Sequence, residues 1–239
     1  MDVLGVQIDA VTPSEALDVA CRLMRSGSPR YVVTPNPEII HAATADPQLR
    51  QSLNGADLSV ADGIGVVRAA KKLGRPLPSR VPGVELAQGL LAYIAAEGKR
   101  LFLLGGKPLV AEKAAGELAK RHAGLNICGH CHGYFKEDTP IIEKIRLAAP
   151  DVIFVCLGSP LQELFMARNL RHVGSALMLG LGGAIDIFAG TKKRAPALFR
   201  GAGLEWLYRF ATQPSRLARA GALPRFARAV NAQKKRERL

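Results

Sequence analysis

Residues 100–106 have the sequence Arg-Leu-Phe-Leu-Leu-Gly-Gly, and this stretch decides the fold class. Its short, uninterrupted apolar run is typical of a strand that is buried on both faces of a sheet. The two glycines end the strand, and the segment that follows is rich in Ala, Glu and Lys, as helices are. The stretch therefore predicts an α/β protein with a mainly parallel sheet.

The same alternation of short apolar runs and amphipathic segments continues on both sides of this strand. It predicts further strands at residues 31–34, 58–61, 152–157 and 176–181, and helices at residues 14–25, 64–73 and 84–97, with another through Ile39 and Ile40. Residues 75–82 contain three prolines and are predicted to form a loop. We expect a Rossmann-like sheet flanked by helices over residues 1–190, which form the main domain.

The basic charge of the chain is concentrated at its C-terminal end. Residues 1–189 contain 20 basic and 18 acidic side chains, whereas residues 190–239 contain 13 basic and 2 acidic ones. Residues 204–212, 215–222 and 225–235 indicate short helices that are separated by Pro214 and Pro224. We therefore expect a basic, amphipathic, helical C-terminal appendage over residues 191–239, with an acidic partner.

The N-terminal residues and the cysteines bear on the compartment and on metal binding. The N-terminus lacks a basic region followed by an apolar stretch, and no apolar run reaches the roughly 18 residues that a membrane-spanning helix needs, so a cytoplasmic protein is expected. Cys128 and Cys131 form a CxxC motif interleaved with His130 and His132. A structural zinc site needs four ligands and no second cysteine pair is present, so ordinary loop residues are the favoured interpretation, with zinc as the alternative.

Polar residues and glycines follow four of the predicted strands, at Thr34-Pro35-Asn36, Ala61-Asp62-Gly63, Leu104-Gly105-Gly106 and Gly158-Ser159-Pro160 with Gln162-Glu163. Ligands of open parallel sheets bind beyond the carboxyl ends of the strands, and a glycine turn before a helix suits a phosphate. The chain contains neither GxGxxG nor GxxxxGK[ST], which disfavours an NAD-type or P-loop site.

Asp62 is the acidic residue that we consider most favourable for a functional role. It lies between an apolar strand and a glycine, which places its carboxylate at the edge of the sheet where ligands bind. The competing interpretation is that Asp62 caps the following helix, as Asp often does at such a position. Thr34 and Asn36 also suit turns, and Arg80 in a proline-rich loop is either solvated or a phosphate clamp.

Eight motifs in register, spanning about residues 3–230, resemble the WecG/TagA/CpsF glycosyltransferase family. They are residues 34–39 (Thr-Pro-Asn-Pro-Glu-Ile), 61–65 (Ala-Asp-Gly-Ile-Gly), 80–83 (Arg-Val-Pro-Gly), 103–106 (Leu-Leu-Gly-Gly), 133–135 (Gly-Tyr-Phe), 158–163 (Gly-Ser-Pro-Leu-Gln-Glu), the segment 180–190, and Arg194-Ala195-Pro196 followed by residues 204–209. The resemblance implies an inverting transferase that moves a sugar from a UDP-sugar to a polyprenyl-diphosphate-linked glycan in bacterial cell-wall or exopolysaccharide synthesis. Residues 1–190 would then form its catalytic domain. N-acetylmannosamine, its uronic acid and glucose are among the sugars that it allows.

The resemblance also implies roles for individual residues. Asp62 is the expected general base, and further residues are expected to bind the sugar and diphosphate (Thr34, Asn36, Arg80, Gln162), to bind the nucleotide (Gly105, Gly106, Tyr134, Gly182, Gly183, Asp186) and to close the active site from the appendage (Arg209, Arg216, Arg219). The chain contains no DxD motif, so transfer without a metal ion or other cofactor is expected, with arginines and backbone N–H groups neutralising the leaving UDP.

The acceptor lies in a membrane, so the expected location is the cytoplasmic face of the inner membrane, where an anionic leaflet would attract the basic appendage. A homo-oligomer is left open. Two alternatives remain at this point: a nucleotide-sugar epimerase or dehydrogenase, which would need a dinucleotide motif, and a nucleic-acid-binding protein that uses its basic tail, which lacks a recognisable motif. No nucleic-acid partner is expected.

Overall fold

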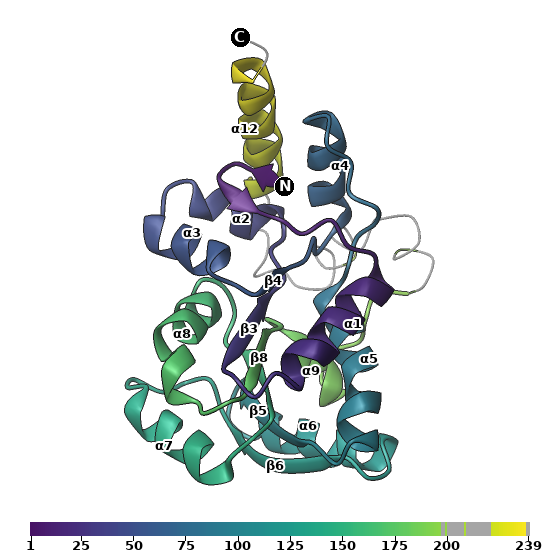
Figure 1. Ribbon diagram of the computed structural model, residues 1–239, viewed down its shortest axis with the longest axis vertical. Coiled ribbons are helices and arrows are strands. Elements are labelled where there is room, and N and C mark those ends of the chain that lie inside the picture. Colours follow the sequence, from purple (N-terminus) through teal and green to yellow (C-terminus); the bar gives the residue numbers. More distant parts are fainter. Residues whose placement is uncertain (197–198, 200–207, 209–220, 238–239) are drawn as a thin grey trace.

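The computed structural model describes residues 1–196, 199, 208 and 221–237. Its centre is a six-stranded sheet in the order β4-β3-β8-β7-β5-β6, in which every pair of neighbouring strands is parallel (Figure 1). The strands are β3 (Arg30–Val33), β4 (Leu58–Ser59), β5 (Arg100–Gly105), β6 (Asn126–Cys131), β7 (Val152–Cys156) and β8 (Leu177–Gly180). The expected α/β fold with a parallel sheet and flanking helices is confirmed.

Helices cover both faces of the sheet, and each face has its own hydrophobic cluster. Within β5, Leu101 and Leu103 belong to one cluster while Phe102 and Leu104 belong to the other, as the two-residue period of a strand requires. The first cluster lies against α1 (Pro13–Met24), α5 (Gly83–Ala96), α6 (Val110–Arg121) and α9 (Ala184–Phe188). The second lies against α2 (Pro37–Ala43), α3 (Pro47–Asn54), α4 (Ile64–Lys72), α7 (Thr139–Ala148), α8 (Leu161–Asn169) and α12 (Ala222–Arg236).

Three helices begin in the same way, with a polar N-cap followed by a proline. Thr12, Asn36 and Asp46 each accept a hydrogen bond from a backbone N–H in the first turn of α1, α2 and α3. Proline suits the first helical position because its missing N–H would have no partner there. The sequence analysis anticipated α1 and α2 but not α3, nor the short β1–β2 hairpin (Asp2–Val3 and Val6–Gln7).

The CxxC motif lies on a strand, which corrects the expectation of a loop. Cys128 and Cys131 belong to edge strand β6, where the pairing with β5 shifts by one residue at Cys128. The Cys128 thiol donates to the Leu101 carbonyl at 3.4 Å, and Cys131 is buried in a hydrophobic cluster. Among the residues that the structure describes, no group of three or more His, Cys, Asp and Glu side chains is placed to hold a metal ion.

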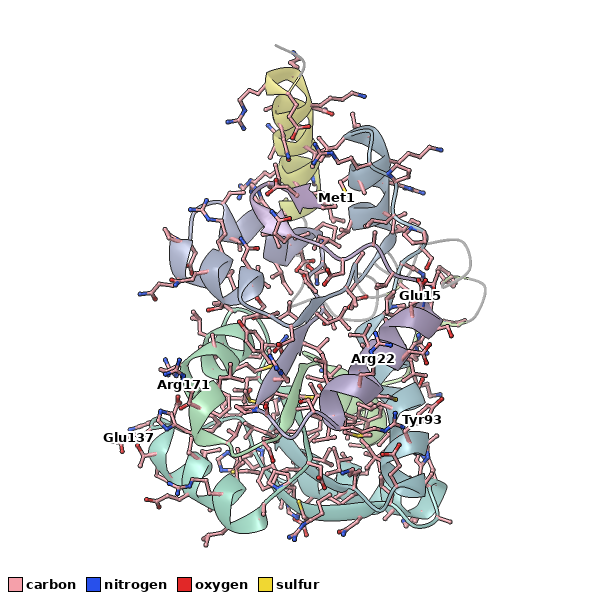
Figure 2. The ribbon with its side chains drawn as sticks, viewed as in Figure 1. Met1, Glu15, Arg22, Tyr93, Glu137 and Arg171 are labelled. Atoms are coloured by element: carbon pink, nitrogen blue, oxygen red, sulfur yellow. The ribbon has the colours of Figure 1, made fainter. Side chains whose placement is uncertain are left out.

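The C-terminal helix α12 packs against the body of the protein. Phe226 and Val230 are buried in the same cluster as α2 and α4, and the Gln233 amide oxygen accepts from the Leu4 backbone N–H at 2.9 Å. Figure 2 shows Met1 beside the base of this helix. The helix expected at residues 225–235 is confirmed but starts at Ala222, so Pro224 lies in its first turn instead of before it.

Residues 204–207 and 209–220, which hold most of the other two expected helices, lie outside the described residues, so the basic appendage and the domain boundary at residue 190 stay predictions. In the part of the chain that is described, none of the helices has the length and apolar character needed to cross a bilayer.

Candidate active site

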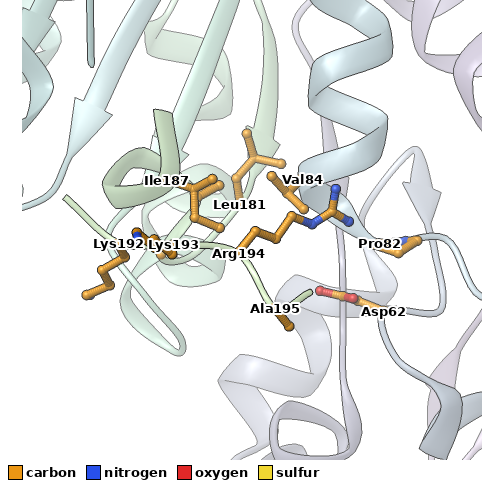
Figure 3. Close-up of a pocket in the computed structure, with 11 residues that line it drawn as sticks. Asp62, Pro82, Val84, Leu181, Ile187, Lys192, Lys193, Arg194 and Ala195 are labelled. Atoms are coloured by element: carbon orange, nitrogen blue, oxygen red, sulfur yellow. The ribbon is translucent and has the colours of Figure 1, made fainter. Parts of the chain in front are cut away.

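A pocket lies at the carboxyl edge of the sheet, where ligands of parallel sheets bind (Figure 3). Four segments form its wall: the end of β4, the start of α5, the turn from β8 into α9, and the segment after α9. The lining residues are Asp62, Pro82, Val84, Leu181, Gly183, Ala184, Ile187, Lys192, Lys193, Arg194 and Ala195. The lining therefore combines the carboxylate of Asp62 with the basic residues Lys192, Lys193 and Arg194 and with several apolar side chains.

Asp62 lies one residue before the N-cap of the helix that follows it. The N-cap of α4 is Gly63, which has φ 109° and makes no side-chain capping bond. A side chain would be strained at this φ, so glycine is required there, and the N-cap position falls on Gly63 and not on Asp62. The Asp62 backbone N–H donates to the Pro35 carbonyl at 3.1 Å, and the carboxylate points across the pocket toward residues 194 and 195 (Figure 3).

The strand ends at Asn36 and Asp62 lie side by side. The Asn36 side chain caps α2 by accepting from the Glu38 and Ile39 N–H groups at 2.9 and 3.0 Å. The first turn of α4 lies against Pro37, since a Cβ at Gly65 would be only 2.6 Å from its ring. Capping uses the amide oxygen of Asn36, so a ligand in this corner would meet the amide nitrogen.

Arg80 reaches the same corner through the backbone of its loop. The Val81 N–H donates to the Ala61 carbonyl at 2.9 Å. Arg80 directly precedes Val81, and Asp62 directly follows Ala61, so this bond brings the two segments together. Arg80 is partly buried. The loop predicted at residues 75–82 thus runs along the edge of the sheet beside the carboxylate.

Thr34 joins the strand that carries it to the next one. Its buried hydroxyl donates to the Gly180 carbonyl at 2.8 Å, linking the ends of β3 and β8. A Cβ at Gly83 would lie 2.9 Å from the Thr34 methyl group, so glycine allows α5 to begin directly against this side chain. Thr34 thereby fixes two of the segments that form the pocket, and its contact with a ligand stays a prediction.

Gln162 holds the turn that forms the pocket wall. Its side chain is buried; the amide oxygen accepts from the Gly182 N–H at 2.8 Å, and the amide nitrogen donates to Glu163 at 2.9 Å. Burial raises the pKa of the Glu163 carboxyl above its usual value. The Gln162 amide oxygen thus binds the protein's own backbone and its amide nitrogen binds the Glu163 side chain, and the predicted contact between Gln162 and substrate is not tested.

The glycines expected at the nucleotide bring three strand ends together. Gly105 has φ 137°, and a Cβ there would lie 2.3 Å from the Cys156 carbonyl oxygen on β7. The Gly106 carbonyl accepts from the Gly133 N–H at 2.9 Å, which places Tyr134 beside the same turn with 68% of its surface exposed. An exposed ring next to a glycine turn suits stacking on a planar base.

Asp186 and the segment after α9 form the basic side of the pocket. The Asp186 carboxylate accepts from the Lys192 ammonium at 2.7 Å, and its backbone carbonyl accepts from the Thr191 and Lys192 N–H groups. Arg194 pairs with Glu85 of α5, and among the described residues its buried Nε has no hydrogen-bond partner. Asp186 therefore orders a loop that presents positive charge, in addition to any contact with a ribose.

The sequence analysis assigned no role to Glu85, Lys192, Lys193 or Arg194. The signal available for the last three was their run of consecutive positive charge two residues after Gly190. No signal in the sequence pointed to Glu85, because its partner Arg194 is 109 residues away in the chain. Arg209, Arg216 and Arg219 lie outside the described residues, so their predicted position over the active site is not tested.

Comparisons with known proteins agree with the resemblance seen in the sequence. The profile of the glycosyl transferase WecG/TagA/CpsF family matches residues 1–239. Curated proteins of Staphylococcus aureus strains NCTC 8325 and COL are each 36% identical over 229 residues, covering 95% of this chain and 90% of theirs. Both are named N-acetylglucosaminyldiphosphoundecaprenol N-acetyl-beta-D-mannosaminyltransferase.

Proposed function

Because the chain belongs to the WecG/TagA/CpsF glycosyl transferase family, we propose that it moves N-acetylmannosamine or another hexose from a UDP-sugar onto a polyprenyl-diphosphate-linked sugar, with inversion. The observation that carries the proposal is the pocket at the carboxyl edge of the sheet, whose lining includes Asp62 together with Lys192, Lys193 and Arg194. The relatives are named for an undecaprenyl-diphosphate-linked acceptor and an N-acetylmannosaminyl product, which supports the choice of substrates. Family membership leaves the epimerase or dehydrogenase alternative without support.

In the proposed reaction Asp62 is the general base. The acceptor hydroxyl attacks the anomeric carbon of the donor sugar, the bond from that carbon to the UDP oxygen breaks, and the hydroxyl proton passes to the Asp62 carboxylate. A single displacement from the face opposite the leaving group gives inversion. A positioned base contributes about 10²–10⁴-fold to such a step. Asn36 and Arg80 flank the carboxylate and are proposed to orient the sugar.

The leaving UDP gains negative charge as the bond breaks, and the basic side of the pocket is proposed to stabilise it. Lys192, Lys193 and Arg194 line the pocket next to Gly183, whose N–H lies at the start of α9, and Lys192 and Arg194 also pair with Asp186 and Glu85. Fixed positive groups aimed at developing charge lower the barrier without solvent rearrangement. The nucleotide is proposed to lie along the same edge, toward Gly105, Gly106 and Tyr134, with the appendage arginines closing over it.

We expect the transfer to proceed without a divalent metal ion, because this cluster of positive charge would serve the diphosphate in its place. The initial rate in excess EDTA should equal the rate in untreated buffer, and added Mg²⁺ should leave it unchanged. A rate that EDTA abolishes and that only Mg²⁺ or Mn²⁺ restores would contradict this expectation.

The donor class can be tested by ligand stabilisation, because a ligand that binds the folded state alone raises the melting temperature. We expect UDP and UDP-N-acetylmannosamine to raise it, with ADP- and GDP-sugars as matched negative controls. Transfer of the stabilising sugar to a synthetic lipid-diphosphate-linked N-acetylglucosamine is the direct assay. Stabilisation by a purine nucleotide sugar, or none by any uridine nucleotide, would refute the proposed donor.

A further inference from the structure

A buried amide and a buried carboxyl group lie next to the turn that joins β8 to α9. Gln162 and Glu163 belong to the first turn of α8, and they are only 2% and 1% exposed. The Glu163 Oε1 accepts from the Gln162 amide at 2.9 Å. Among the residues that the structure describes, the buried Oε2 of Glu163 has no hydrogen-bond partner. A carboxyl group in such a position lowers the stability of the fold.

The Gln162 amide can satisfy its neighbours in one orientation only. Its oxygen accepts from the Gly182 N–H at 2.8 Å, and its nitrogen faces the acceptor oxygen of Glu163. A reversed amide would set two donors against each other at Gly182 and two acceptors against each other at Glu163. A Cβ at Gly180 would lie 3.2 Å from the amide nitrogen, so the amide also fits closely against β8. The Glu163 carboxyl group therefore selects the orientation that Gly182 requires.

The Gly182 N–H lies just beyond the pairing of β8 with β7. The Leu181 N–H donates to the Val155 carbonyl at 2.8 Å, and Gly182 follows with φ 55° and turns the chain toward α9. Its neighbours Leu181, Gly183 and Ala184 all line the pocket. A buried backbone N–H needs an acceptor, and here a side chain supplies it. The bond to Gln162 thus holds the middle of one wall of the pocket.

We propose that Glu163 is a positioning residue for sugar transfer, which fixes the Gln162 amide and thereby holds residues 181–184 against the diphosphate of the donor. The identity of that ligand rests on the proposed function. Gln162 then serves the reaction through the turn, since its 2% exposure leaves almost no surface for direct contact with a sugar. The proposal also explains why a destabilising buried acid is present beside the pocket, because functional sites retain such groups at a cost in stability.

The test separates the acceptor oxygen of Glu163 from its acidity. Glu163→Gln keeps an oxygen that can accept from Gln162, whereas Glu163→Met has a similar length and keeps none. The kcat of the Met variant should fall at least about tenfold, because small displacements of groups around the reacting atoms are costly in the transition state. The Gln variant should stay within about twofold of the parent. A Gln variant as slow as the Met variant, or a Met variant as fast as the parent, would overturn the proposal.

The melting temperature of Glu163→Met should stay close to that of the parent, because the lost hydrogen bond is offset by removal of an unpartnered buried oxygen. The KM for the donor should also change little, since the displaced wall matters most when the leaving group gains charge. Activity lost at unchanged stability is a result that a purely structural role would not give.

Asn169→Leu is the matched control, because it removes a buried amide from the other end of α8. The Asn169 amide donates to the Phe165 carbonyl at 3.1 Å and to the Asp138 carboxylate at 2.6 Å. This variant should melt at a lower temperature, since both acceptors lose a donor, and it should keep the turnover of the parent. Losses of activity that follow the melting temperature in both variants would overturn the proposal, because general destabilisation would then explain them.

Double substitution tests whether Glu163 acts through Gln162. Gln162→Met removes the connecting amide, so it should lower kcat as Glu163→Met does, and the double variant should be no slower than either single variant. Additive losses would contradict this connection. A Gln162→Met protein with a raised donor KM and an unchanged kcat would assign Gln162 to direct substrate binding and overturn the proposal. The same variant supplies the test if Glu163→Met does not fold.

Hydrogen exchange at the Gly182 N–H reports the same contact without any substrate. Exchange measured by NMR should be at least about tenfold faster in Glu163→Met and Gln162→Met than in the parent, and unchanged in Glu163→Gln and Asn169→Leu. Equal rates in all five proteins would overturn the proposal. If the parent transfers sugar from none of the UDP-sugars, the proposed function fails, whereas the exchange rates still decide whether Glu163 fixes the turn.

Discussion

Replacing Asp62 by Asn should reduce turnover at least about a hundredfold while leaving UDP binding unchanged. The amide has almost the shape of the carboxylate but cannot accept the acceptor's proton. Its carbonyl and N–H groups preserve the hydrogen-bonding capacity at the pocket wall, so the loss should appear in kcat more than in KM. Steady-state transfer rates and UDP titration by calorimetry measure the two effects separately.

The matched control is Asp18→Asn, which removes the same charge from an exposed position on α1. This variant should retain normal turnover and normal stability, because no described contact depends on the Asp18 carboxylate. Near-normal turnover in Asp62→Asn would remove the assignment of the base, whereas loss of UDP binding in that variant would mean that Asp62 serves the nucleotide.

Replacing Gly105 by Ala should lower the free energy of unfolding by roughly 3–5 kcal/mol, combining strain at a positive φ with steric overlap. The added Cβ would lie 2.3 Å from the Cys156 carbonyl oxygen, and neither backbone can move without breaking the pairing of β5 with β7. Urea denaturation measures the effect as a shift of the midpoint at constant slope.

Gly116→Ala is the control for this substitution. Gly116 lies inside α6, and a Cβ there would meet nothing within 4 Å. This variant should gain about 0.5–1 kcal/mol, because alanine favours a helix over glycine. A Gly105→Ala protein as stable as the parent would show that the glycine turn is not required by the packing of the strand ends.

The sequence was sufficient to predict the edge of the sheet where the pocket lies. The apolar runs before Asp62 and before Gly105 are each followed by a glycine within two residues, and parallel strands bring such ends to one edge. Strand β6 was missed because its sequence, Asn-Ile-Cys-Gly-His-Cys, has neither an apolar run nor alternation. Its place in the sheet comes from pairing with β5, which is a long-range contact.

The details of the site depended on three-dimensional geometry. Only the structure shows that the N-cap position of α4 is Gly63 and not Asp62. The pairing of Arg194 with Glu85 joins residues that sequence patterns do not connect, and the buried neighbour Glu163 acts through Gln162, a side chain that the sequence analysis assigned to substrate. Local sequence patterns thus locate the pocket. Which residues support the pocket structurally, and which face a ligand, depends on packing in three dimensions.

The most direct test of the central claim is a structure of the protein with a UDP-sugar analogue and an acceptor analogue bound together. We predict that a carboxylate oxygen of Asp62 lies within hydrogen-bond reach, about 2.6–3.2 Å, of the acceptor hydroxyl that faces the anomeric carbon. A carboxylate that is turned away from both sugars and bonded only to the protein would contradict the mechanism proposed for this enzyme.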